Sequence, residues 1–330
     1  MNPSTPPLFE IAVIGAGGAG QMAILRAVLN HLNTLLFVGN ADTIRKSRAT
    51  WVAEVDNIPG MFDKKKPISA TTQETIRFIQ SREDLKDLLT IVKCGVETIQ
   101  KENNEFVFHC KSGTYRAKYV VLCTGTMDLQ PHIQGSIKPI LPYANRGDVY
   151  YCIRCDGHKT AGHACAVIGE RPLSGNIAIK LKERYNLPKI TILTHGKPFQ
   201  GDTELRQLLK EYHVDIVEGE ITDIIGDPKT GLQGFRVDGH GEVKATKAFA
   251  MLGSIIYNEL AKQLGVKLHE SGQVLVNEVC ETSVSGFFAA GDLVYDKKNQ
   301  VYTAWDMAVD AVDEIDARVR ASRRQNARQK

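Results

Sequence analysis

The chain alternates between short apolar runs and longer segments whose apolar residues recur at helical spacing. Residues 9–14 (FEIAVI) form a β-branched apolar run, which is typical of a buried strand, and the segment QMAILRAVLNHL that begins at Gln21 has helical periodicity. A second apolar run, TLLFVG, covers residues 34–39. Strand, glycine-rich turn, helix and strand in this order predict the first half of a doubly wound α/β sheet.

The pattern then continues along the chain and repeats itself once. Residues 72–90 have helical spacing, 94–112 alternate like an antiparallel meander, and 117–125 read as a buried strand. A second strand–turn–helix unit begins near Ala164, and a last helix is predicted from about Thr303 to Arg320. Further strands are predicted within 214–246, at 247–253, at 272–277 (GQVLVN) and at 286–293 (GFFAAGDL).

This repetition sets the predicted domain organisation. The 330 residues suffice for about two domains. Because the strands after residue 250 read as a continuation of the first unit, the second unit is predicted to be inserted in it. We expect two Rossmann-like dinucleotide-binding domains, one formed by 1–126 and 248–330 and the other by 127–247.

The glycine-rich turn carries the first candidate chemistry. Gly15 permits the tight turn, Gly17 lets the backbone approach a pyrophosphate, and Gly20 lets helix and strand pack closely. The amides of the helix start then face the phosphates, which adds Gly18 and Ala19 to the predicted site. At the end of the second strand, where an acid usually binds the ribose, the chain offers Gly39, Asn40 and Asp42.

Composition and charge exclude several classes of protein. Hydrophobic residues make up 43% and charged residues 24%, no apolar run approaches the roughly 20 residues of a membrane span, and no secretory signal is recognised at the N-terminus. We therefore expect a cytoplasmic protein with no membrane or nucleic-acid partner. The basic segment after Arg318 is either a solvated helix end or a surface for an acidic partner.

The second candidate site is YYCIRCDGH at residues 150–158. Taken alone, Cys152 and Cys155 fit half of a zinc site, a structural cross-link or a redox-active dithiol. The spacing of these cysteines to His158 and His163 fits no common zinc finger, so we predict no metal site. The chain has seven cysteines, a modest and odd number that argues against a disulfide-stapled secreted fold. This favours the redox-active dithiol.

Further motifs resemble those of flavoproteins with two dinucleotide-binding domains. Residues 282–292 (TSVSGFFAAGD) resemble the second FAD motif of that group, and VLCTG at 121–125 resembles its A-T-G turn. Within the group the chain is most similar to the low-molecular-weight thioredoxin reductases, which carry C-x-x-C-D-G in the inserted domain. Residues 55–60 (VDNIPG) resemble their V-E-N-x-P-G loop, and Asn299, Gln300 and Val301 stand where they have R-Q-A.

The resemblance implies roles for individual residues. Cys155 would face the flavin, Cys152 would attack the disulfide of a thioredoxin-like or other partner, and Asp156 would be the acid/base. A homodimer is also expected only from the resemblance. Besides the residues of the glycine turn and of the second strand end, the expected FAD contacts are Asn57, Val96, Thr124, Gly125, Gly291, Asp292, Gln300, Val301, Tyr302 and Trp305.

The chain departs from these relatives where they bind NADPH. Glu170 and Pro172 stand in the second glycine turn, and a single Lys197 stands where the family has an arginine cluster for the 2′-phosphate. NADPH is therefore not the expected electron donor, and ferredoxin or a second FAD is expected in its place. Tyr302 and Trp305 would either stack on a flavin or pack in the core or at the dimer interface.

Two other functions stay open at this point. One alternative is a dithiol oxidase that passes electrons to oxygen. The other is a flavin-binding redox sensor that catalyses no reaction.

Overall fold

The computed structural model describes residues 6–39, 47–52, 54–62 and 64–329. These residues divide into two compact units. The first comprises the described residues up to 39 with 68–126 and 256–329, and the second comprises those of 47–67 with 127–255. The loop that contains Asn57 thus lies with the segment that carries the cysteine pair. Which dinucleotide each unit binds stays a prediction.

The first unit is built on a mostly parallel sheet with the strand order β3-β2-β1-β6-β5-β4, and β17 pairs with β6 on its other side. The long strand β6 pairs in parallel with β1 and β17 and antiparallel with β5, so it joins the doubly wound sheet to the predicted meander. The strands are β1 (Leu8–Ile14), β2 (Thr34–Phe37), β3 (Leu89–Val92), β4 (Thr98–Glu102), β5 (Glu105–Cys110), β6 (Gly113–Leu122) and β17 (Phe287–Ala289).

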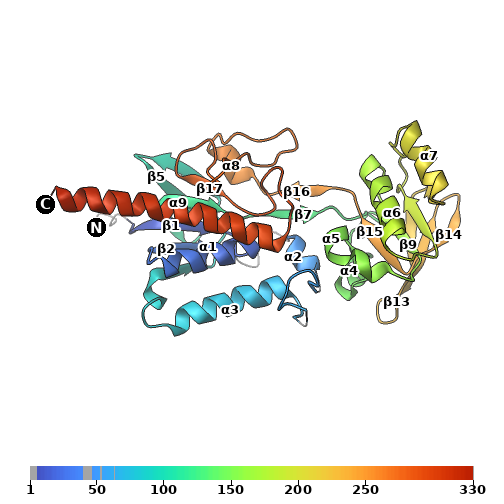
Figure 1. Ribbon diagram of the computed structural model, residues 1–330, viewed down its shortest axis with the longest axis horizontal. Coiled ribbons are helices and arrows are strands. Elements are labelled where there is room, and N and C mark those ends of the chain that lie inside the picture. Colours follow the sequence, from blue (N-terminus) through green and yellow to red (C-terminus); the bar gives the residue numbers. More distant parts are fainter. Residues whose placement is uncertain (1–5, 40–46, 53, 63, 330) are drawn as a thin grey trace. The chain divides into compact units, whose positions relative to one another are not determined.

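Two long helices of this unit run side by side, α1 and α9 (Figure 1). Arg26 of the first donates two hydrogen bonds, of 2.6 and 3.0 Å, to Asp313 of the second. The apolar faces of both helices belong to the core that covers the parallel strands. The helical segments of the unit are α1 (Gly18–Leu29), α3 (Pro67–Ser81), η1 (Lys86–Leu88), α8 (Glu259–Gln263) and α9 (Val301–Arg328).

Two predicted elements differ from the structure. The helix expected over 72–90 is α3, which ends at Ser81, and the apolar run at 89–92 is instead the edge strand β3, paired in parallel with β2. Sheet pairing overrides the helical spacing there. The backbone of Leu89–Val92 forms hydrogen bonds with the open edge of β2, and Thr, Ile and Val favour strands over helices. The strand expected at 272–277 forms only isolated bridges at Val274, to Leu268 and Val294.

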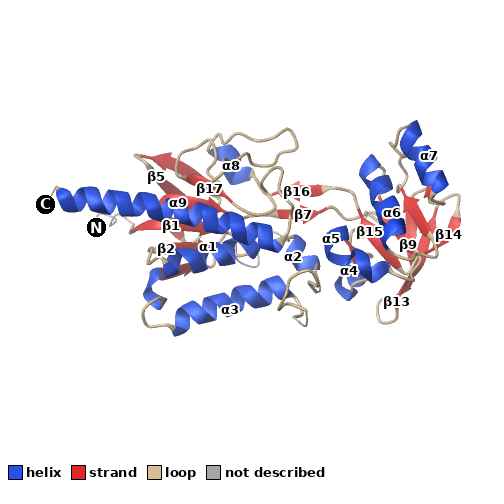
Figure 2. Cartoon of the chain, in the orientation of Figure 1, coloured by secondary structure: helices blue, strands red, loops and turns tan. Residues whose placement is uncertain are grey.

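The second unit has a five-stranded parallel sheet in the order β11-β10-β9-β15-β8 and a separate antiparallel sheet of three strands, β12-β13-β14. Helix α6 packs on β9 and β10 and also contacts α7, as the strands and helices of Figure 2 show. The strands are β8 (Val149–Tyr150), β9 (Cys165–Ile168), β10 (Ile190–Leu193), β11 (Asp215–Val217), β12 (Ile221–Asp227), β13 (Gly231–Val237), β14 (Gly241–Lys244) and β15 (Lys247–Ala250).

The helical segments of the second unit are short, apart from α6. They are α2 (Arg48–Trp51), α4 (Leu141–Arg146), α5 (Ile153–Asp156), η2 (Gly157–Thr160), α6 (Pro172–Arg184) and α7 (Thr203–Glu211). Where the chain passes between the two units, β7 (Thr126–Asp128) and β16 (Ser254–Ile256) pair with each other. This doubly wound α/β architecture confirms the predicted fold class.

The last helix is longer than the sequence pattern predicts, because it continues from Arg320 to Arg328. Its arginines are held by acidic residues of the same unit. Arg318 binds Glu281 through two hydrogen bonds of 2.5 and 2.7 Å, and Arg323 lies 2.7 Å from Glu10. A good part of the basic segment is therefore neutralised inside the unit. Among the described helices, none is long and apolar enough to cross a bilayer.

Candidate functional site

Cys152 and Cys155 form a disulfide at the start of the short helix α5, with their Cα atoms 5.3 Å apart. The first helical turn brings the two sulfurs together, because residues three apart lie on the same face. The backbone amide of Cys155 donates to the sulfur of Cys152 at 3.2 Å, and the amide of Asp156 donates to the carbonyl oxygen of Cys152 at 3.0 Å. The pair is thus held by its own backbone turn.

Asp156 follows the pair directly and its side chain is only 10% exposed. Burial raises the pKa of this carboxyl to about 6, although the nearby Lys159 ammonium opposes the change. A carboxyl group with this pKa can both give and take a proton close to neutral pH, which an exposed aspartate cannot do. Its position directly after Cys155, its burial and its pKa therefore suit Asp156 to acid/base work in the cavity that the cysteines also line.

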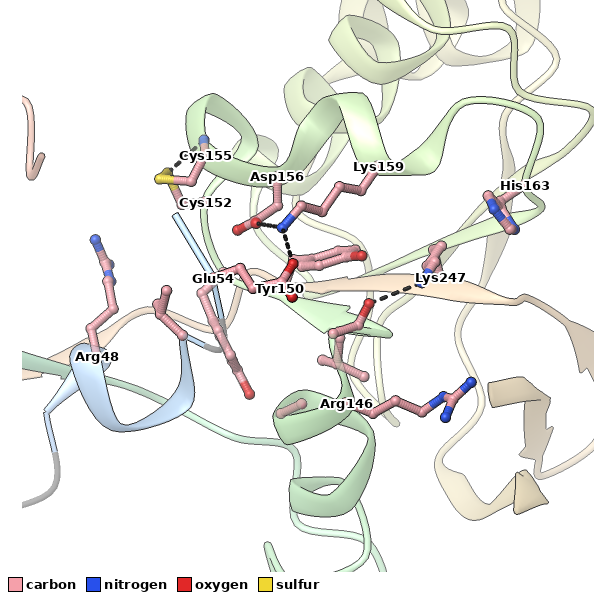
Figure 3. A pocket seen from close by; sticks show the side chains of 15 residues that line it. Arg48, Glu54, Arg146, Tyr150, Cys152, Cys155, Asp156, Lys159, His163 and Lys247 are labelled. Carbon is pink, nitrogen blue, oxygen red and sulfur yellow. Dashed lines mark hydrogen bonds and ion pairs between the residues drawn. A yellow bond between two sulfur atoms is a disulfide. The ribbon is translucent and has the colours of Figure 1, made fainter. Parts of the chain in front are cut away.

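Lys159 lies among three carboxylates, two of which, those of Asp156 and Glu54, are drawn in Figure 3. Its ammonium nitrogen is 3.0 Å from Asp56, 3.3 Å from Asp156 and 3.7 Å from Glu54. The ring of His158 does not point at this lysine but lies 3.1 Å from Asp56. The sequence predicted neither Lys159 nor Asp56 as part of the site. The spacing of three residues between Asp156 and Lys159 was an available signal, and Asp56 lies in the loop 55–60, of which only Asn57 was predicted as a contact.

A cavity of about 320 Å³ opens beside the cysteines within the second unit (Figure 3). Both cysteines, Asp156 and Lys159 line it, together with aromatic side chains of β8 and its flank. At its other end Lys247 is 2.9 Å from the buried Asp148. The disulfide and its acid are therefore accessible from one common space.

The predicted glycine turn has the geometry of a phosphate cradle in the first unit. A Cβ on Gly20 would lie 1.8 Å from the carbonyl oxygen of Gly15, so the helix start and the strand end touch. A Cβ on Gly17 would meet no atom within 4 Å, which leaves open space beside the amides at the start of α1. No side chain caps the start of α1 at Gly17, and the first turn of the helix contains no acidic residue. The turn therefore fits a dinucleotide phosphate.

Other predicted FAD residues gather at the same edge of the sheet. A Cβ on Gly291, after β17, would lie 3.2 Å from Ala19, and one on Gly18 would lie 3.6 Å from Val301 at the start of α9. The Thr124 hydroxyl donates to the carbonyl oxygen of Tyr257 at 2.6 Å, which fixes the turn after β6. The starts of α1 and α9 and the Gly291–Asp292 turn thus converge. This arrangement fits the long phosphate and ribityl portion of FAD.

The remaining predicted contacts differ in exposure and do not all lie in the first unit. Gly39 follows β2 with a positive φ of 73°, and Val96 packs against the core of the first unit. Tyr302 is 43% exposed, whereas Trp305 has a buried indole nitrogen without a hydrogen-bond partner. Five further positions complete the set. Gly125 ends the turn after β6, Gln300 is the N-cap residue of α9, and Asn57 lies in the second unit, whereas Asn40 and Asp42 fall outside the described residues.

The second glycine turn has a different character. Glu170 follows β9 with a side chain that is only 7% exposed, and its carboxylate lies 3.3 Å from the Lys197 ammonium, which comes after β10. Burial alone would raise the pKa of Glu170, but a backbone hydrogen bond and Lys197 hold it below its usual value. A carboxylate therefore stands before the N-terminus of α6, and Pro172 removes an amide from its first turn.

The other cysteines are free and buried. Burial raises the pKa of Cys165 to about 12 and that of Cys280 to about 11, so both stay protonated near neutral pH. Cys94 differs from them. Burial alone would raise the pKa of its thiol, but contacts with the Ser112 backbone and the Cys110 side chain lower it.

Known proteins resemble this chain over nearly its whole length. The family model described as pyridine nucleotide-disulphide oxidoreductase matches residues 9–309. The thioredoxin reductase sirT of Leptosphaeria maculans is 25% identical over 310 residues, covering 90% of each chain. The thioredoxin reductase of Helicobacter pylori J99 is 26% identical over 333 residues, covering 93% of this chain and 98% of the relative.

Solved structures also match the fold of the chain. The thioredoxin reductase from Streptococcus pyogenes superposes with a TM-score of 0.81 at 19% identity, covering 96% of this chain and all of that one. This superposition shows the fold. The family model and the thioredoxin reductases that match along nearly the whole chain show a flavin thiol/disulfide oxidoreductase. With the family model spanning residues 9–309, the chain belongs to the pyridine nucleotide-disulphide oxidoreductase family.

Proposed function

We propose that the chain is an FAD-dependent disulfide oxidoreductase that transfers two electrons to a partner disulfide and does not take them from NADPH. The donor we propose is ferredoxin or a second flavin, the acceptor a thioredoxin-like protein or another disulfide substrate, and the active form a homodimer. The single observation that carries the proposal is the Glu170–Lys197 ion pair at the start of α6.

That ion pair argues against a pyrophosphate at the same turn. A phosphate bound before α6 would lie next to a buried carboxylate, and the resulting repulsion would occur in a medium of low dielectric. Among the residues that the structure describes, the cation nearest to Glu170 is Lys197, which is a point charge rather than a bidentate guanidinium. Arg171 reaches Glu170 only at 4.0 Å. The same ion pair thus weakens binding of the NADPH pyrophosphate at the turn before α6 and binding of its 2′-phosphate by Lys197.

The first unit supports the flavin part of the proposal. Gly15, Gly17, Gly18, Ala19 and Gly20 would hold the FAD phosphates with their backbone. When bound, FAD supplies two-electron chemistry at the isoalloxazine ring. We assign the residues at the start of α9 and the Gly291–Asp292 turn to the same cofactor, and Asn57 and Val96 remain proposed contacts.

The chain's own groups account for the disulfide exchange. In the dithiol form, the Cys152 thiolate attacks one sulfur of the partner disulfide, and the sulfur–sulfur bond of the partner breaks. Asp156 gives its proton to the departing thiolate. Cys155 then attacks the Cys152 sulfur, which restores the internal disulfide and releases the second partner thiol. Two electrons leave the pair, and the partner disulfide becomes a dithiol.

The proposal is tested on the FAD-loaded protein under anaerobic conditions. NADPH is added first and reduced ferredoxin second, while the visible absorption band of the flavin is followed. We expect NADPH to leave the band unchanged. Reduced ferredoxin should bleach the band if ferredoxin is the electron donor. Dithionite serves as the control that the flavin is reducible. Rapid bleaching by NADPH would contradict the proposal, whereas inertness to ferredoxin would favour the second flavin as donor.

A further inference from the structure

Lys159 has an unusual position for a residue next to a redox-active pair. Its side chain is 20% exposed and extends from η2, one turn after Asp156 (Figure 3). Asp56 and Glu54 reach it from the loop that precedes residue 60. The ammonium thus bridges a buried carboxylate beside the disulfide and two carboxylates that are distant in sequence.

We propose that Lys159 is a positioning residue for the proton transfer by Asp156, and that Asp56 holds Lys159 in place for this task. The inference rests on the proposed function, because it assumes that Asp156 is the acid of the disulfide exchange. It adds two residues that act through Asp156 and that are not expected to touch the substrate.

The charges of the three groups support this division of work. Burial alone would raise the pKa of Asp56, but Lys159 and His158 hold it below its usual range, so Asp56 stays ionised. Burial alone would lower the pKa of Lys159, but Asp56 and Asp156 raise it, so the ammonium stays charged. Asp156 is then the member of the cluster that exchanges a proton near neutral pH.

The two neighbours act on Asp156 in opposite directions. Lys159 stabilises the carboxylate that is left after Asp156 has given its proton to the leaving thiolate. Asp56 is a second negative charge close by, and it opposes ionisation of Asp156. The proton affinity of Asp156 is set by the balance of the two, and moving Lys159 by a small distance would change that balance.

Other charged groups around Asp156 have a smaller part. Glu54 contacts Lys159 at 3.7 Å, and His158 contacts Asp56 rather than Asp156. Burial raises the pKa of Tyr150, on the neighbouring strand β8, so its hydroxyl stays neutral. Farther along the cavity, Asp148 binds both Lys247, at 2.9 Å, and Arg146, at 3.0 Å.

The test uses the FAD-loaded protein in its dithiol form and an uncharged disulfide, hydroxyethyl disulfide, whose leaving thiol is basic and needs a proton. The rate at which Cys152 and Cys155 are reoxidised is followed by alkylation and mass spectrometry over a range of pH. The pH at which the rate falls, as Asp156 loses its proton, is the measured quantity. Dithiodipyridine is the control substrate, because its weakly basic leaving group needs no proton.

Four proteins are compared. Lys159→Met should move the falling limb upward by about one pH unit or more, because an opposite charge in contact lowers a carboxyl pKa by roughly that amount. Asp56→Asn should move it downward, and Lys159→Arg should leave it near that of the unaltered protein. With dithiodipyridine the limb should vanish in all four.

Opposite movements of the two charge-removing variants would not arise from a merely structural role. If the limbs of Lys159→Met and Asp56→Asn coincide with that of the unaltered protein while reoxidation proceeds, the inference is overturned and the proposed function stands. If the unaltered dithiol is not reoxidised by either disulfide, the proposed function itself fails. Flavin content checks folding, and Asp56→Asn still decides the matter if Lys159→Met does not fold.

Discussion

The carboxylate of Glu170 lies 3.3 Å from the ammonium of Lys197 at the turn where α6 begins. The two members differ greatly in exposure: the Glu170 side chain is 7% exposed and that of Lys197 is 64% exposed. The lysine reaches from solvent to a carboxylate that the fold has buried. The relationship is therefore asymmetric, and removal of one partner should have a different effect from removal of the other.

Lys197→Ala should lower the free energy of unfolding by about 1–3 kcal/mol, because it leaves the Glu170 carboxylate buried without its ammonium. The double variant Glu170→Gln with Lys197→Ala should recover most of this loss. Urea unfolding of the two single variants and the double variant measures the coupling. A double variant whose destabilisation equals the sum of those of the two single variants would show that the contact contributes nothing.

Gly17 and Gly20 should respond differently to the same substitution. Gly17→Ala adds a methyl group where no atom lies within 4 Å, so the protein should fold but lose bound FAD, because the methyl group occupies the phosphate space. Gly20→Ala places a Cβ 1.8 Å from Gly15 and should destabilise the fold itself. Flavin absorbance and thermal unfolding of both variants measure the difference. A Gly17→Ala protein with full flavin content would argue against this cradle.

Asp156 should make stability depend on pH in the acid range. Its folded pKa of about 6 lies above the ordinary value of 3.8, so the folded state favours the protonated form. The stabilisation is complete below about pH 4 and is lost as pH rises through about 6, by roughly 3 kcal/mol. Asp156→Asn cannot ionise and should not show this fall. Unfolding curves at several pH values should therefore separate the two proteins most strongly above pH 6.

Glu281 should give the opposite pH dependence. Its hydrogen bonds with Arg318 are the main cause of a pKa below the usual 4.5, so its stabilising effect is present above that value and is lost as pH falls. Arg318→Met should reduce the free energy of unfolding by about 2 kcal/mol near neutral pH and by less in acid. The exposed Arg324, altered to Ala, is the matched control and should change little. An equal effect of both substitutions would contradict the assignment.

The buried thiols should be distinguishable from the active pair by alkylation. In the native dithiol protein, iodoacetamide should modify Cys152 and Cys155 before Cys165 and Cys280, whose pKa values burial raises to about 12 and about 11. Peptide mass spectrometry at short reaction times gives the order, and denaturant should make all positions reactive. Alkylation of Cys165 as fast as that of Cys152 would contradict the prediction.

The sequence alone determined the features that depend on local chemistry. Apolar runs and helical spacing predicted β1, α1 and β2 around the glycine turn, because a buried parallel strand and an amphipathic helix each have their own period. The spacing of Cys152 and Cys155 and the small odd number of cysteines favoured a dithiol pair, and the two sulfurs form a disulfide in the structure. Glu170 and Pro172 could likewise be recognised in the sequence, because they occupy the second glycine turn, where the resembling reductases bind the NADPH pyrophosphate.

Only the tertiary structure decided which distant groups share a site. The run at 89–92 became an edge strand because β2 offered it a partner, which helical spacing within the segment does not register. Lys159 meets Asp56 across about a hundred positions of chain, and Lys197 meets Glu170 across a strand and a helix. Charges find such partners through packing and burial, and these depend on the whole fold rather than on neighbouring residues.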